Sequence, residues 1–235
     1  QDGDFSIVFN GEIYNHNHFR KKLPNKYWKG TSDTETLLEI YRNQDIESVL
    51  SSIRGMFSFC IHDKRKNILY LARDLAGEKP LYICTNNKYL GFSSEVSPFK
   101  LFPGFKKSLN IEAVNYFLKK NYIPYPLSIY KGVFKLPPAS LMTIDLNLFK
   151  YSHHDSFDEF ISSDGVKLES WWEMPKAQDK FNLNSDKEII DKTEDILLKS
   201  VSQQLISDVP LGSFLSGGID SSLIVALMNS CSAKN

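Results

Sequence analysis

The sequence predicts a chain in two parts, an α+β first part and an α/β last third. From residue 5 to residue 144, short apolar runs recur between turn-forming residues, as expected for strands with a few helices. After residue 185, apolar residues recur at helical spacing and a glycine-rich loop follows. Between them, 151–179 shows no sustained period, so we expect a connection there. These observations predict two domains built in different ways.

In the first part, apolar runs predict strands at 5–9, 12–14, 56–62, 67–73, 81–85, 89–93, 133–136 and 140–144. Segment 32–35 matches the capping box and opens a helix over 36–41, and a second helix is expected at 111–119. Asn10-Gly11 lies between the first two runs and is a strong hairpin signal, because a type I′ turn needs positive φ at both positions. A hairpin turn is therefore one interpretation of this pair.

In the last third, Ser185 to Glu188 forms a second capping box. It opens a long amphipathic helix that continues to Leu205. An apolar strand over 209–215, the loop 216–222 and a helix beginning at Ser221 follow. The order helix, strand, glycine-rich loop, helix is typical of α/β domains.

Composition excludes several classes of protein. The 235 residues include 28 basic and 28 acidic ones, so no overall attraction to nucleic acid or anionic membrane is expected. No apolar run approaches the ~18 residues of a membrane helix. Cys60, Cys84 and Cys231 form no C-x-x-C pair, which argues against disulfides or a thiolate metal site and suits a reducing compartment. His153 and His154 lack a spaced third ligand, so no metal site is expected.

The two ends suggest a fragment of a longer protein. The chain has no initiator Met, and its first strand begins at Phe5. Its last helix has barely begun to pack when the sequence stops at Asn235.

The loop 216–222 has the composition of a phosphate cradle. Gly217 and Gly218 let the backbone approach an anion, and the following helix N-terminus adds partial positive charge. Ser216 adds a hydroxyl donor, as do the serines at the loop's end. The alternative is a glycine-rich turn with Asp220 or Ser221 as the helix N-cap. The three flanking hydroxyls favour anion binding.

This loop resembles the pyrophosphate-binding loop of the ATP pyrophosphatase family, and 207–212 looks like its approach in asparagine synthetases. The resemblance implies that Leu215 lines an ATP site. It also implies a set of residues that hold the phosphates together with Mg²⁺: Ser216, Gly217, Gly218, Asp220, Ser221 and Ser222.

Five further segments resemble, in order, the glutaminase domain of glutamine-dependent asparagine synthetases: 10–15, 30–35, 55–59, 73–82 and 92–95. This is a class II amidotransferase domain with an N-terminal nucleophile fold, so layered antiparallel sheets with helices are expected. The implied domains are an amidotransferase domain at 1–172, which includes the connection from about 151, and the start of a parallel-sheet ATP pyrophosphatase domain at 181–235.

The resemblance implies roles for individual residues. The Asn10 side chain and the Gly11 N–H would form the oxyanion hole, and Glu12 and Asp33 would bind the α-ammonium group of glutamine. Without it, Glu12 is an exposed strand carboxylate and Asp33 a helix N-cap or first-turn acid. Arg73 and Asp74 are interpreted as an internal ion pair that shapes the site.

The family's N-terminal cysteine nucleophile has no counterpart here, since none of the three cysteines has that position. Either the chain is truncated upstream, which we favour, or the parent protein takes ammonia directly.

The implied function is that of a fragment of a cytoplasmic, glutamine-hydrolysing asparagine synthetase. Ammonia released from glutamine would amidate an adenylated aspartate, with ATP going to AMP and pyrophosphate. The substrates are small molecules, and neither nucleic acid nor membrane is an expected partner; a homodimer stays open. One alternative is an amidotransferase for another carboxylate, such as a sugar acid in polysaccharide synthesis. Another is a non-catalytic relative.

Overall fold

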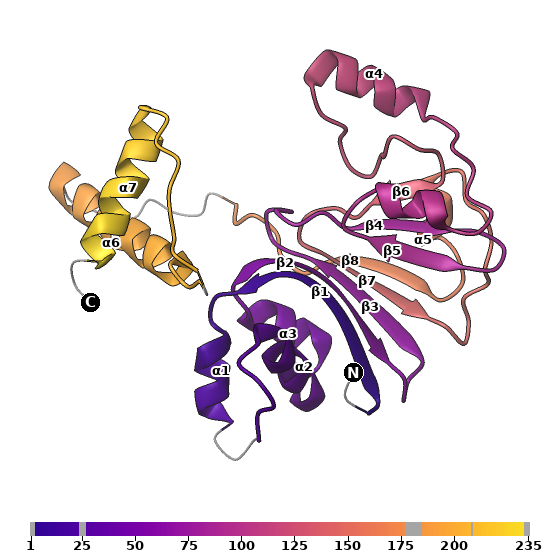
Figure 1. The fold of residues 1–235 in the computed structure, drawn as a ribbon, viewed down its shortest axis with the longest axis horizontal. Helices are drawn as coiled ribbons and strands as arrows, with labels where there is room; N and C mark the ends of the chain where they lie inside the picture. The colour runs from indigo at the N-terminus through magenta and orange to yellow at the C-terminus, as the bar shows by residue number, and fades with distance from the viewer. Residues whose placement is uncertain (1–2, 24–26, 177–184, 208, 233–235) are drawn as a thin grey trace. The chain divides into compact units, whose positions relative to one another are not determined.

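The computed structural model describes residues 3–23, 27–176, 185–207 and 209–232 (Figure 1). The chain divides into two compact units, Gln1–Glu173 and Met174–Asn235. Each unit is described by itself.

The first unit contains two antiparallel sheets. The larger has the strand order β1-β2-β3-β7-β8, with β1 at Phe5–Ile13, β2 at Gly55–Asp63, β3 at Ile68–Arg73, β7 at Ser140–Asp145 and β8 at Val166–Ser170. The smaller has the order β5-β4-β6, with β4 at Tyr82–Thr85, β5 at Leu90–Ser93 and β6 at Val133–Lys135. Layered antiparallel sheets with helices, as the sequence predicts, are confirmed.

Helices cover one face of the larger sheet and the smaller sheet covers the other (Figure 1). The covering helices are α1 at His16–Lys22, α2 at Asp33–Asn43 and α3 at Ile46–Ser52. Three further helical segments lie elsewhere in this unit: the 3₁₀ helix η1 at Ser97–Leu101, α4 at Ile111–Lys120 and α5 at Phe157–Ile161.

The alternation of side chains along the strands creates two cores. In β2, Phe57, Phe59 and Ile61 pack with the helices, whereas Cys60 packs with the smaller sheet. In β1, the odd-numbered residues from Phe5 to Ile13 face the helices. The even-numbered residues, including Asn10, therefore face away from the helical layer.

The second unit is a pair of helices, α6 at Asp186–Gln204 and α7 at Ile219–Ser232. Ser185 caps α6 by accepting from the N–H of Glu188, which confirms the predicted start. Leu227 of α7 is 5% exposed, while many other apolar side chains of this unit are open to solvent. Among the described residues of both units, no helix combines the length and apolar character needed to cross a membrane.

Three expectations from the sequence were wrong. Asn10-Gly11 makes no hairpin turn, because β1 continues through both residues and pairs with β2 at all nine positions. The expected connection over 151–179 contains α5 and β8. All five residues of β8 pair with β7. The expected strand at 209–215 is not formed, since no other strand in the described part of this unit offers it backbone partners.

Candidate functional site

Asn10 and Gly11 lie side by side in β1, on the edge strand of the larger sheet. The Asn10 side-chain amide donates to Ser94 Oγ at 2.9 Å. Gly11 has a φ of +150°, and a Cβ there would overlap the Met56 carbonyl oxygen and lie 2.7 Å from Phe57 Cα in β2. Only glycine allows β1 this close to β2, so the pair fixes where the Asn10 amide is held.

A cavity of about 410 Å³ opens beside Asn10. Ser58 and Cys60 from β2 line it, as do Ser94 and Glu95, which follow β5. Gly11, Glu12 and Asp33 are not among its lining residues. The structure therefore joins Asn10 to the segment around Ser94, whereas Gly11 and Glu12 lie farther along β1 and Asp33 lies at the start of α2.

Asp33 starts α2 and contacts the end of β1. Its Oδ2 accepts from the Ile13 N–H at 2.9 Å, directly after Glu12 in the chain. The N-cap of α2 is Ser32, whose hydroxyl accepts from Thr34 N. Asp33 is thus a first-turn acid, and its carboxylate is fixed against the strand that carries Glu12.

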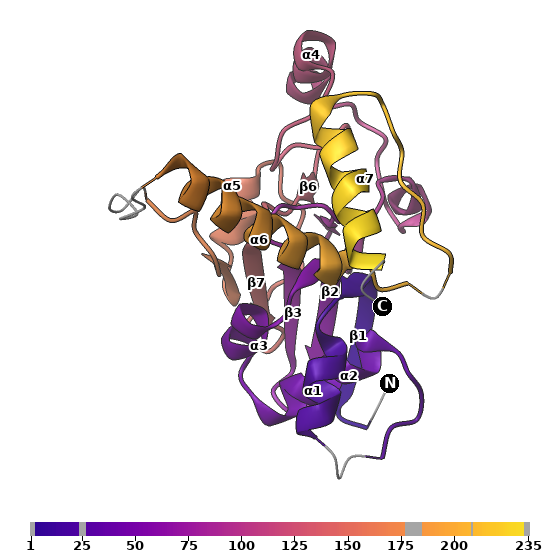
Figure 2. The same ribbon diagram turned by 90° about the vertical axis from the view of Figure 1, so that its left-hand side faces the viewer.

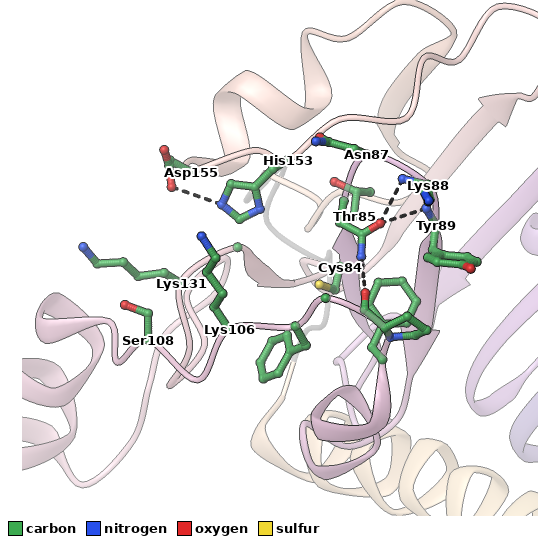
Figure 3. A pocket seen from close by; sticks show the side chains of 16 residues that line it. Cys84, Thr85, Asn87, Lys88, Tyr89, Lys106, Ser108, Lys131, His153 and Asp155 are labelled. Carbon is green, nitrogen blue, oxygen red and sulfur yellow. Dashed lines mark hydrogen bonds and ion pairs between the residues drawn. The ribbon is translucent and has the colours of Figure 1, made fainter.

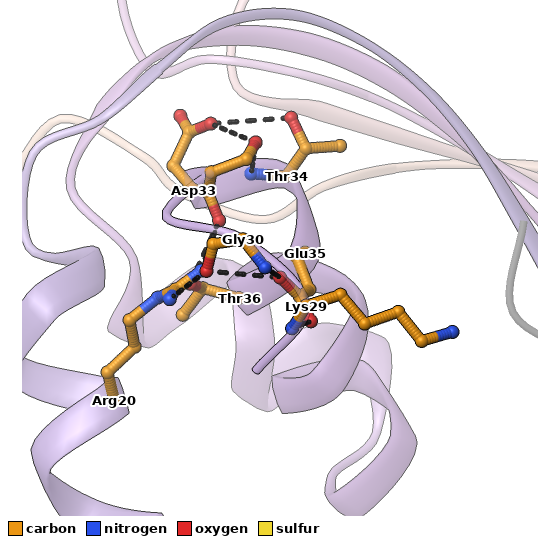
Figure 4. Close-up of polar contacts among 8 residues, drawn as sticks. Arg20, Lys29, Gly30, Asp33, Thr34, Glu35 and Thr36 are labelled. Atoms are coloured by element: carbon orange, nitrogen blue, oxygen red, sulfur yellow. Dashed lines mark hydrogen bonds and ion pairs between the residues drawn. The ribbon is translucent and has the colours of Figure 1, made fainter. Parts of the chain in front are cut away.

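Arg20 of α1 holds the loop that leads into α2 (Figure 4). Its guanidinium donates to Thr36 Oγ1, the Gly30 carbonyl and the Ser32 carbonyl, each at 2.7 Å. Glu35 lies 3.7 Å from the same guanidinium and accepts from the N–H of Gly30 at 3.0 Å. These contacts fix the position from which Asp33 reaches β1.

Negative charge gathers near Tyr14, just beyond β1. Burial, followed by the charges of Glu78, Glu12 and Asp74, raises the pKa of Tyr14. A place where carboxylates already lie close together favours a cation over an anion. Among the two residues predicted to bind an ammonium group, Glu12 is one of these carboxylates.

Arg73 and Asp74 shape the neighbouring loop, but not by pairing with each other. The Arg73 guanidinium donates to the carbonyls of Lys79 and Gly77 on the loop and to that of Leu136, which precedes β7. Asp74 accepts from the N–H groups of Glu78 and Lys79, and from that of Phe57 in β2. No ion pair between them appears in the described part of the chain, so the predicted pair was wrong. Each side chain instead makes its own hydrogen bonds to backbone groups.

The cysteines of this unit are unsuited to nucleophilic attack. Burial raises the pKa of Cys60 to about 12 and that of Cys84 to about 11, so both thiols are protonated at neutral pH. Cys60 packs as a small apolar side chain, as its place in an alternating strand predicts.

In the second unit, the segment predicted as the loop 216–222 is a loop only to residue 218, and 219–222 are the first turn of α7. Gly217 has a φ of +81°, and the helix begins at Ile219. Asp220 and Ser221 are therefore first-turn residues, and the alternative that either is the N-cap was wrong.

The hydroxyls of this loop are close together. Ser216 Oγ lies 2.9 Å from Ser221 Oγ, and Ser222 Oγ donates to the Gly218 carbonyl at 2.8 Å. The loop is open to solvent, and Leu215 before it is 62% exposed. The arrangement leaves backbone N–H groups and hydroxyls together at a helix N-terminus, which suits a phosphate.

Two of the residues that build the first site carried no assigned role in the sequence. Ser94 belongs to a segment with a family resemblance, but its bond to Asn10 spans 84 positions, so no local spacing could reveal it. Arg20 lies in a helix that the sequence did not predict. Its three acceptors share no pattern that short-range analysis detects.

Comparison with known proteins gives matches to both parts of the chain. The glutamine amidotransferase domain family matches residues 1–154, and the asparagine synthase family matches 192–235. A putative glutamine-hydrolysing asparagine synthetase 2 of Methanocaldococcus jannaschii is 34% identical over 227 residues, which is 96% of this chain and 40% of the relative. The glutamine-hydrolysing asparagine synthetase 1 of Bacillus subtilis is 35% identical over 230 residues, 97% of this chain and 33% of the relative.

Among solved structures, the glutamine phosphoribosylpyrophosphate amidotransferase of B. subtilis matches with a TM-score of 0.46 and 16% identity. The match covers 98% of this chain and 45% of that one. The chain spans less than half the length of each of these proteins.

Proposed function

The chain belongs to the glutamine amidotransferase domain family, and on that premise we propose that it forms part of a cytoplasmic, glutamine-hydrolysing asparagine synthetase. In the whole protein, residues 1–172 serve the release of ammonia from glutamine. Residues 181–235 open the domain that uses ATP and Mg²⁺ to activate aspartate. Two family matches in one chain, together with relatives named as glutamine-hydrolysing asparagine synthetases that match 96% and 97% of it, support this proposal.

The observation that carries the glutaminase half is the geometry of Asn10. Its side-chain nitrogen has two N–H donors, and within the described residues one hydrogen bond, to Ser94, is made from it. The second N–H is left for the oxygen that becomes negative when the glutamine amide is attacked. Gly11 keeps β1 in the position that aims this donor.

Recognition of the glutamine backbone is assigned to the far end of β1. Asp33 is held there by the Ile13 N–H, directly after Glu12. The carboxylates of Glu12 and Asp33 would bind the α-ammonium group of the amino acid by charge-assisted hydrogen bonds. The attacking group is not assigned to Cys60 or Cys84, whose buried thiols are protonated.

The loop 216–222 fits a polyphosphate. The N–H groups at the start of α7 and the hydroxyls of Ser216, Ser221 and Ser222 would hold the phosphate oxygens, and Asp220 in the first turn would help to hold Mg²⁺. When bound, ATP would supply the adenylyl group that makes the acceptor carboxylate reactive, with pyrophosphate as the leaving group. The residues of this loop bind and orient the phosphates.

A substitution in the whole protein tests the division of labour. Asp220→Asn is expected to abolish aspartate-dependent release of pyrophosphate from ATP while glutamine hydrolysis stays within twofold of the unchanged protein. Glu194→Gln, at an exposed position of α6, is the matched control and should leave both activities intact. Retained pyrophosphate release in Asp220→Asn would contradict the role of the loop.

A further inference from the structure

A second, larger cavity lies away from Asn10, on the first unit. Its volume is about 870 Å³, and its walls come from four segments: 84–89, from the end of β4 to the turn before β5; the loop 102–108; 131–132, just before β6; and 153–155 (Figure 3). None of the residues assigned to glutamine lines it.

Positive charge dominates the lining. Lys88, Lys106 and Lys131 contribute three ammonium groups, and Asp155 contributes the one carboxylate. The Asp155 carboxylate contacts the His153 imidazole, with Oδ1 3.3 Å from Nε2. No carboxylate in the described part of the chain pairs with any of the three lysines. In a chain with no net charge, this is a local concentration of unpaired positive charge.

Neutral donors are also part of the wall. Ser108 and Asn87 line the cavity, and Figure 3 shows Ser108 below Lys131 and Asn87 across from His153. Thr85 lines it too, is 3% exposed, and its Oγ1 has no hydrogen-bond partner. This oxygen has almost no exposed surface of its own, so it lies behind the surface of the cavity.

Hydrogen bonds join the walls to one another. Asn86 donates from its side chain to the Pro103 carbonyl at 2.6 Å, and its Oδ1 accepts from the N–H groups of the turn. The Lys131 N–H donates to the Ser108 carbonyl at 2.9 Å. Gly132 has a φ of +69°, and a Cβ there would lie 2.8 Å from His153 Cε1, so the imidazole is packed directly on the backbone. The cavity is therefore preformed.

From this combination we propose that the cavity binds a small molecule with several negative charges, held by Lys88, Lys106 and Lys131. Phosphate and carboxylate groups both satisfy this chemistry. Ser108 and Asn87 supply neutral hydrogen bonds, which orient the anion once the lysines have attracted it. Such a site shares no lining residue with the cavity beside Asn10.

Calorimetric titration of the full-length protein tests the site, with pyrophosphate and citrate as the phosphate and carboxylate probes. Lys106→Gln combined with Lys131→Gln is expected to weaken binding of the preferred probe at least tenfold. Lys119→Gln combined with Lys120→Gln is the matched control, because these lysines lie at the exposed end of α4 outside the cavity. The control pair should change affinity less than twofold.

Pyrophosphate binding to the loop 216–222 is separated by a second pair, Ser216→Ala with Ser222→Ala. The cavity site persists in that variant and is lost in the Lys106 and Lys131 variant. Equal weakening by the cavity and control lysine pairs, or no binding of either probe to the loop variant, would overturn the proposal.

Discussion

At the scale of single residues, Gly11 controls how closely β1 approaches β2. Gly11→Ala places a methyl group against the Met56 carbonyl and Phe57 Cα, at a φ that side chains rarely adopt. We expect the free energy of unfolding to fall by about 3 kcal/mol and glutamine hydrolysis to be lost. Urea denaturation measures the first and ammonia release the second.

Gly30→Ala is the control for this substitution. The nearest atom to an added Cβ there is Glu35 Oε2 at 3.9 Å, so the methyl group finds space. A midpoint of unfolding for Gly11→Ala equal to that of Gly30→Ala would show that β1 can shift without cost.

The residues of the glutamine site could be proposed from the sequence only through several motifs taken together. Asn10-Gly11 alone favours a hairpin turn, because the two residues tolerate positive φ. The turn does not form, because β1 and β2 pair at nine positions whose partners are about 50 residues apart in the chain. Long-range pairing therefore overrides the local preference. Ser94 stayed without a role for the same reason, since its bond to Asn10 is entirely tertiary.

At the scale of elements, α1 positions α2 through Arg20. Arg20→Lys keeps the charge but cannot reach Gly30, Ser32 and Thr36 at once. Because Asp33 then loses its fixed position against β1, we expect KM for glutamine to rise about tenfold with a smaller change in kcat. Steady-state glutaminase kinetics measure both.

Arg42→Lys is the control for Arg20→Lys, since Arg42 pairs with Glu39 within α2 and lies away from the loop. A fall in kcat at unchanged KM in Arg20→Lys would assign Arg20 to a step after glutamine binding.

A second link joins α2 to β2 through a buried carboxylate. Asp63 accepts from the Tyr41 hydroxyl at 3.0 Å and from Arg65. Burial disfavours the charge, but these hydrogen bonds outweigh it and lower the pKa of Asp63 below its ordinary value of 3.8. The stabilisation is therefore present above pH 3.8 and is lost as pH falls through the lower, folded-state pKa.

Asp63→Asn tests this link by its pH dependence. It should be less stable than the unchanged protein at neutral pH by about 1–3 kcal/mol, and the difference should shrink below pH 3.8. Thermal unfolding between pH 3 and pH 7 measures the difference. Asp164→Asn, at an exposed ion pair with Lys150, should show no such trend. A difference that stays constant with pH would mean that the Asp63 charge does not contribute.

Elements were predictable from the sequence where local signals and tertiary partners agree. The N-caps of α2 and α6 are Ser32 and Ser185, the first residues of the two predicted capping boxes, because a serine hydroxyl caps a helix by short-range chemistry. The apolar run 209–215 has the right residues for a strand, but a strand also needs a neighbour, which sequence periodicity does not supply. The opposite error occurred at β8, which was not predicted as a strand. Apolar and polar residues alternate there over only five positions, and the segment becomes a strand because it pairs with β7.

At the scale of the whole molecule, the two units carry separate chemistry in the proposed enzyme, and one substitution should separate them. Asn10→Leu keeps the volume of the side chain and removes the donor proposed for the oxyanion, a loss of about 3 kcal/mol in transition-state stabilisation. In the whole protein, glutamine-dependent amide synthesis should fall at least a hundredfold, while ammonium-dependent synthesis stays within twofold. Ammonium thus serves as an internal control for folding, because it supplies the nitrogen that is no longer released from glutamine. An equal fall with both nitrogen sources would contradict the separation and place Asn10 in a role common to both reactions.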